Sequence, residues 1–220
     1  MTYWRWAALA AFGVICCTVG FGQIPGIRAC GGSDAILAFE FVTSPADMAQ
    51  LFPASCRAVH VAAQYRGLAL DSFGFIPIYS SFLILCLLAL RGEGRTEERG
   101  VARAAIIMTL VAAACDQFEG VQLYRLLGSI PGDQATINLL MPAVRIKFAL
   151  LALVVAVIGG LFFRRGGWRM LVALLLLGGA AVSLFGLFAN RALVMQGNGI
   201  AWLVLIIVVL VNALRKPQAA

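Results

Sequence analysis

Ionisable side chains recur inside the apolar stretches of this sequence. Three acids (Asp71, Asp116 and Glu119) and two bases (Arg145 and Lys147) fall in segments that are otherwise rich in Leu, Val and Ala. Carboxyl groups in such places can act as general acids or bases, and together with the bases they can form buried ion pairs. The three acids are therefore the candidate catalytic residues. All five are candidates for a ligand-binding site or a structural ion-pair cluster.

These residues lie at matching depths along their segments. At about 1.5 Å per residue, Glu119 lies about 24 Å from Arg103 along its segment, and Lys147 lies about 26 Å from Arg164 along its own. Asp116 precedes Glu119 by three positions and shares its helix face. We predict that Lys147 bridges Asp116 and Glu119, and that Asp71 pairs with Arg145.

Three interpretations of this set remain open. Charges facing lipid would each cost about 2.5–3.5 kcal/mol on insertion scales, so the residues are expected to pair inside the protein. The pairs can fix how the helices pack, or bind a small ligand, a lipid head group or a quinone. They can also take part in chemistry or proton transfer. Tyr79 adds hydrogen-bonding capacity at a similar depth and belongs to the candidate site.

Other residues with chemical potential form no recognisable motif. His60 is the only histidine, so we expect a surface residue and no metal site. The spacing of Ser72, His60 and Asp71 does not specify a nucleophile. No glycine-rich loop suited to phosphate is present, and no motif identifies a cofactor.

The amino-acid composition indicates that these residues belong to a membrane protein. The chain has 220 residues, of which 62% are hydrophobic and only 12% charged, whereas about a quarter are charged in soluble proteins. Six stretches have the roughly 20 apolar residues that cross a bilayer. The predicted fold class is an all-α membrane protein, a six-transmembrane-helix bundle forming a single transmembrane domain over residues 1–220. The predicted spans are residues 5–22, 68–90, 101–127, 136–163, 169–189 and 193–214.

Basic residues indicate the orientation of the chain. With the amino terminus inside, the cytoplasmic side holds three acids, Glu93, Glu97 and Glu98, and these bases: Arg5, Arg91, Arg95, Arg99, Arg103, Arg164, Arg165, Arg169, Arg215 and Lys216. This excess equals the whole net charge of +7 and satisfies the positive-inside rule. Both termini are therefore expected in the cytoplasm, and the basic total does not indicate a nucleic-acid partner. Residues 6–21 could instead form the apolar part of a signal peptide, but an uncleaved span is preferred.

The connection over residues 23–67 is predicted to form an extracytoplasmic cap. Its apolar residues and the helix-start pattern Ser44-Pro45-Ala46-Asp47 predict short amphipathic helices. Cys30 and Cys56 both lie in this connection, so they can form a disulfide in an oxidising compartment or remain two free thiols.

Four short segments resemble an uncharacterised family of small bacterial polytopic membrane proteins. They are Ala38-Phe39-Glu40, the run from Leu70 to Tyr79, Asp116-Gln117-Phe118-Glu119, and the run from Lys147 to Leu151. The resemblance covers about residues 35–163. It implies a bacterial inner-membrane protein with a recurring set of Asp, Asp or Glu, and Lys, and it implies no activity.

Three functions compete at this point. The first is a binding or accessory protein that docks in a larger membrane complex or holds a lipid or quinone, with membrane lipids and other membrane subunits as partners. The second is a membrane enzyme acting on a lipid or isoprenoid, with Asp71, Asp116 or Glu119 as acid or base. The third is a proton-coupled carrier. The absence of a catalytic motif favours the first function over an enzyme.

Overall fold

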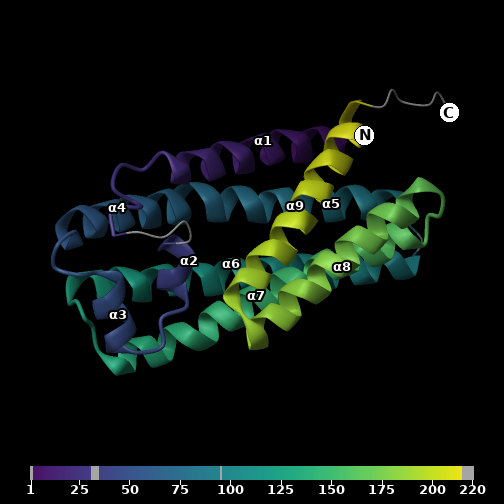
Figure 1. The fold of residues 1–220 in the computed structure, drawn as a ribbon. Helices are drawn as coiled ribbons and strands as arrows, with labels where there is room; N and C mark the ends of the chain where they lie inside the picture. Colours follow the sequence, from purple (N-terminus) through teal and green to yellow (C-terminus); the bar gives the residue numbers. More distant parts are fainter. Residues whose placement is uncertain (1, 31–34, 95, 215–220) are drawn as a thin grey trace. The chain divides into compact units, whose positions relative to one another are not determined.

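The described part of the chain is built from helices. The structure is a computed structural model of the 220-residue chain, and it describes residues 2–30, 35–94 and 96–214. Turns and loops join the helices, and the described residues contain no strand. The elements are α1 (Thr2–Gly22), α2 (Ala35–Glu40), α3 (Pro45–Leu51), α4 (Arg57–Leu70), the π-helical turn η1 (Asp71–Phe75), α5 (Ile76–Glu93), α6 (Thr96–Gly128), α7 (Gln134–Phe163), α8 (Trp168–Ala189) and α9 (Arg191–Leu214), most of them labelled in Figure 1.

Six helical segments in the described residues are long and apolar enough to cross a membrane. They are Tyr3–Gly22, Arg57–Gly92, Thr96–Gly128, Gln134–Phe163, Trp168–Ala189 and Arg191–Leu214. The predicted fold class is therefore confirmed as all-helical with six candidate spans. Three of the basic residues that indicate orientation, Arg95, Arg215 and Lys216, lie outside the described residues.

The second span begins earlier than predicted. α4 continues through η1 into α5, so the helical segment starts at Arg57 and not near residue 68. α4 carries the polar residues His60, Gln64 and Arg66. A span predicted from hydropathy alone stops where such residues begin. They do not end a helix, because backbone hydrogen bonds hold it together.

Pro77 explains the π-helical turn at the junction. Proline has no N–H, and its ring crowds the carbonyl four residues earlier, which belongs here to Phe73. The chain accommodates this with a wider turn in which the Ile76 N–H donates to the carbonyl of Asp71. Turns of this kind occur frequently at functional sites, and this one begins at an acid of the candidate site.

The chain divides into two compact units, which are described separately. Unit 1 comprises Met1–Val14, Ile78–Ala112 and Phe148–Ala220, and unit 2 comprises Ile15–Pro77 and Ala113–Lys147. The boundaries fall within α1, α5, α6 and α7, so these helices contribute residues to both units. The single domain expected from the sequence stays a prediction.

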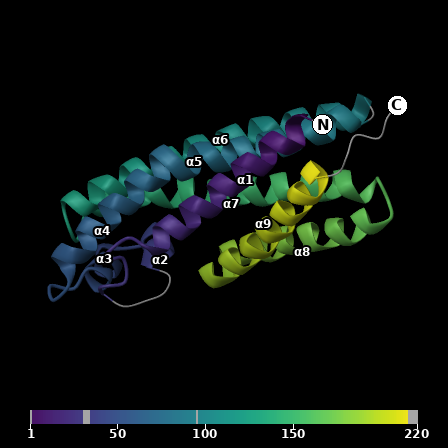
Figure 2. The same ribbon diagram turned by 90° about the horizontal axis from the view of Figure 1, so that it is seen from above.

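In unit 1, α8 and α9 lie side by side (Figures 1 and 2), with only Asn190 between them. Glycines make this approach possible. A Cβ atom on Gly179 would lie 2.8 Å from the carbonyl oxygen of Gly197, closer than real side chains come. Small residues at helix contacts of this kind are typical of membrane proteins. On α9, the ring of Trp202 packs edge-on against Tyr79, with ring centroids 5.9 Å apart.

In unit 2, the first connection contains the short helices α2 and α3, as the sequence predicts, and they lie next to each other. Pro45 is the first residue of α3, and the Ser44 hydroxyl accepts a hydrogen bond from the Asp47 N–H at 3.1 Å. The Asp47 carboxylate accepts from the Thr43 N–H at 2.9 Å and from its hydroxyl at 2.6 Å. The hydrogen bonds from Thr43 lower the pKa of Asp47. This reciprocal cap fixes the path of the chain just after Glu40.

Candidate functional site: a lysine with three carboxylates

The ammonium of Lys147 contacts three carboxylates in unit 2. Its Nζ lies 3.2 Å from Oε2 of Glu40, 3.0 Å from Oδ1 of Asp116 and 2.8 Å from Oε2 of Glu119. An ammonium has three N–H donors, so each can find an acceptor here. We call these four residues the Lys147 cluster.

Two acids of the Lys147 cluster come from one face of α6. Asp116 and Glu119 are three positions apart, which brings their side chains to the same side of the helix. They are 5% and 2% exposed, and Lys147 on α7 is 4% exposed. The predicted contact of Lys147 with both acids is present in the structure.

Glu40, the last residue of α2, is the member that the sequence does not assign to the set. Its proximity to Lys147 cannot be predicted from the sequence, because Glu40 lies in the long connection and no periodicity indicates the path of such a segment. The Phe39-Glu40 pair within the resemblance is the available signal. Phe39 is 1% exposed and packs edge-on against Phe52, with ring centroids 5.3 Å apart. Burial raises the pKa of Glu40, although the neighbouring Lys147 acts to lower it.

The Lys147 cluster holds more acid than base. One ammonium and three carboxylates would carry a net charge of −2 if all were ionised. Removing uncompensated charge from water is costly, and a carboxyl group can avoid that cost by binding a proton. Glu40, whose pKa burial raises, is the member of the cluster suited to bind such a proton.

Asp71 lies in the same unit but outside the contacts of Lys147. It makes no ion pair among the described residues and lines a cavity of about 20 Å³. That volume holds one water-sized group, since a water needs about 10–15 Å³ on this measure. The polar residues of the lining are Glu40, Gln64 and Asp71, and the remainder is Phe21, Ile36, Phe39, Gly67, Leu68 and Leu123.

A side-chain contact ties Asp71 to the helix that carries Asp116. The Gln117 amide donates to the carbonyl oxygen of Ser72 at 2.8 Å. Ser72 follows Asp71 in η1, and Gln117 follows Asp116 in α6. The hydrogen bond therefore fixes the π-helical turn against α6 beside both acids.

The predicted ion pair between Asp71 and Arg145 is wrong. Arg145 is exposed, and no ion pair joins it to Asp71 in the described part of the chain. Arg145 precedes Lys147 by two positions, which places it about 200° away around α7. A helix that turns Lys147 toward the acids must turn Arg145 away from them.

Tyr79, the remaining candidate, belongs to unit 1. It is 1% exposed and packs against Trp202 there. The structure thus gives Tyr79 a place in the packing of unit 1.

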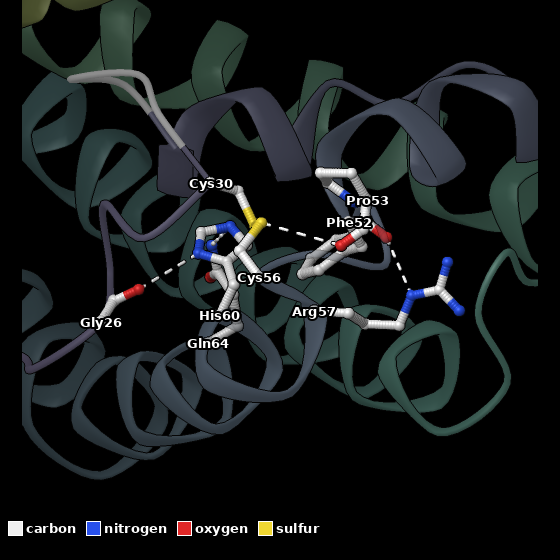
Figure 3. The surroundings of a disulfide bond; sticks show 8 residues. All are labelled: Gly26, Cys30, Phe52, Pro53, Cys56, Arg57, His60 and Gln64. Carbon is white, nitrogen blue, oxygen red and sulfur yellow. Dashed lines mark hydrogen bonds between the residues drawn. A yellow bond between two sulfur atoms is a disulfide. The ribbon is translucent and has the colours of Figure 1, made fainter.

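A disulfide joins Cys30 to Cys56 in unit 2 and ties the chain after α1 to the start of α4 (Figure 3). His60 lies beside it and is 2% exposed, so the expectation of a surface histidine is wrong. The His60 Nδ1–H donates to the carbonyl of Gly26 at 3.3 Å, and Nε2 accepts from the Gln64 amide at 3.4 Å. The imidazole ring can be buried because both of its nitrogens have hydrogen-bond partners within the protein.

No group of three or more His, Cys, Asp or Glu side chains in the described residues is arranged to hold a metal ion. The small cavity is lined by two carboxyl groups and an amide, and the Lys147 cluster adds an ammonium and two further carboxyl groups. Such groups exchange hydrogen bonds and protons.

Comparisons with protein-family models, curated proteins and solved structures found no match to this chain.

Proposed function

We propose that this chain is an integral membrane binding protein that holds the polar head of a lipid-soluble ligand, a lipid or a quinone. The observation that carries the proposal is the cavity on which Asp71, Glu40 and Gln64 converge between apolar walls. Binding sites for small ligands typically combine mostly apolar walls with a few convergent polar groups.

The size of the cavity limits what enters it. About 20 Å³ accepts a single carbonyl, hydroxyl or ammonium group, so the rest of the ligand lies outside among the apolar side chains. Asp71 is suited to meet that group because it makes no ion pair in the described residues. When protonated, the Asp71 carboxyl group donates a hydrogen bond to a carbonyl oxygen. When ionised, it accepts a hydrogen bond from a hydroxyl or ammonium group.

The membrane concerned is, in this proposal, the bacterial inner membrane, with both termini in the cytoplasm. The bias of Arg and Lys toward the expected cytoplasmic ends supports that orientation. An accessory role in a larger membrane complex belongs to the same proposal, supported by the absence of a catalytic motif.

Mass spectrometry of protein purified with its native lipids tests the proposal. We expect the wild-type protein and the exposed-site control Arg145→Gln to retain the same lipid or quinone, and Asp71→Asn to lose it. Equal retention by Asp71→Asn and the control would contradict a ligand at this cavity.

A membrane enzyme acting on a lipid or isoprenoid is the second candidate, because a carboxyl group without a basic partner can act as acid or base. Asp71 lines the cavity and makes no ion pair in the described residues. Incubating the purified protein with lipid extract separates the two candidates. A new product that Asp71→Asn does not form supports the enzyme, and an unchanged extract supports binding alone.

A further inference from the structure

A second, larger hollow lies elsewhere in unit 2. It is an open groove of about 530 Å³, lined by Ala54, Arg57, Ala58, Val61, Leu127 and Ile130. None of these six residues lines the cavity at Asp71. The volume falls within the range of about 300–1,000 Å³ that is typical of small-ligand sites.

Arg57 is the charged residue of this lining, and its guanidinium is held in place. Its Nε–H donates to the carbonyl oxygen of Phe52 at 2.9 Å. Figure 3 shows the guanidinium pointing away from the disulfide and from His60. The side chain is exposed and no ion pair involves it among the described residues. The terminal nitrogens therefore remain available as a planar pair of donors, which suits a phosphate.

The other side chains that line the groove are apolar, and the described lining contains no acid. A fixed cation beside a hydrocarbon surface is complementary to an anionic head group joined to an acyl chain. A free anion would use only Arg57, and a neutral hydrocarbon would leave it without a partner.

We propose that this groove binds one membrane phospholipid, with its phosphate on the Arg57 guanidinium and an acyl chain along Val61, Leu127 and Ile130. The site is independent of the proposed ligand at Asp71, because the two sites share no lining residue.

Native mass spectrometry with phosphatidylglycerol as the probe tests the proposal. Arg57→Gln removes the charge, and Ala58→Trp fills the groove while keeping the charge. Arg66→Gln is the matched control, since Arg66 is also an exposed arginine of α4 and lies about half a turn away around the helix. A melting curve for each variant establishes that it is folded.

We expect Arg57→Gln and Ala58→Trp to weaken retention of one lipid about tenfold, the scale of a charge-assisted hydrogen bond. Arg66→Gln and Asp71→Asn should retain it. Equal retention by Arg57→Gln and Arg66→Gln would overturn the site. Displacement of the lipid by an equal concentration of inorganic phosphate would overturn the phospholipid as its occupant.

Discussion

The ammonium of Lys147 on α7 lies 3.2 Å from the carboxylate of Glu40 on α2, across 107 positions of the chain. This contact attaches a short helix of the first connection to the acids of α6. The connection is therefore part of the candidate site, because it supplies one of the three carboxylates and part of the cavity lining.

Replacing Lys147 with Met should destabilise the protein by about 3–5 kcal/mol, because the buried acids Asp116 and Glu119 and the half-buried Glu40 lose their common partner. Denaturant unfolding in lipid–detergent micelles measures the change in the free energy of unfolding. Arg145→Gln is the control on the same helix and should change stability by less than about 0.5 kcal/mol. A similar loss in both variants would show that Lys147 has no special role.

Replacing Glu40 with Gln should flatten the dependence of stability on pH. The folded-state pKa of Glu40 is raised, so the folded protein binds this proton more tightly than the unfolded chain, whose Glu pKa is about 4.3. The resulting stability is fully present below about pH 4.3 and is lost as the pH rises through the folded pKa.

The effect is measured as the free energy of unfolding of the wild type, Glu40→Gln and the exposed control Glu97→Gln, at pH values from below about 4.3 upward. We expect the wild type and Glu97→Gln to lose stability more steeply than Glu40→Gln as the pH rises. Three parallel curves would show that the pKa of Glu40 is not raised by folding.

Removing the disulfide with the pair Cys30→Ser and Cys56→Ser should cost about 3.5 kcal/mol, as estimated from the entropy of closing a loop of this length. The two cysteines are 26 positions apart. A reductant should lower the melting temperature of the wild type and leave that of the double variant unchanged. Cys16→Ala, at an exposed free cysteine, should keep the response of the wild type. No effect of reductant on the wild type would contradict a bond that stabilises the fold.

Alanine at Gly179 should destabilise the contact of α8 with α9 by about 1–3 kcal/mol through overpacking. Its Cβ atom would lie 2.8 Å from a backbone oxygen of α9, whereas a Cβ atom on Gly178 meets nothing within 4 Å. Gly178→Ala is thus the matched control and should be neutral or stabilising by about 0.5–1 kcal/mol. Thermal unfolding of both variants distinguishes them, and equal melting temperatures would argue against close packing at Gly179.

The contact of Lys147 with Asp116 and Glu119 was predictable because it depends on regular helix geometry. Depth follows from the rise per residue, and the shared face of the two acids follows from their spacing. The predicted pair of Asp71 with Arg145 used depth alone and ignored the angular positions of Arg145 and Lys147 on α7. Depth and angle are both needed to place a side chain.

The role of the connection could not be predicted in the same way. Glu40 is half-buried and His60 is buried, through contacts between residues that are far apart in the sequence. The local periodicity of a sequence does not reveal such contacts. The early start of the second span was missed for another reason. Hydropathy reports which residues prefer lipid, whereas α4 is a polar helix that continues into an apolar one.

A double-mutant cycle with Lys147→Met and Glu40→Gln tests most directly whether Lys147 holds these acids together. The free energies of unfolding of the wild type, both single variants and the double variant give the coupling between the two side chains. The Lys147 cluster predicts a coupling of about 1–3 kcal/mol, since residues in one ion-pair network do not act independently. Effects that add to within about 0.5 kcal/mol would contradict it.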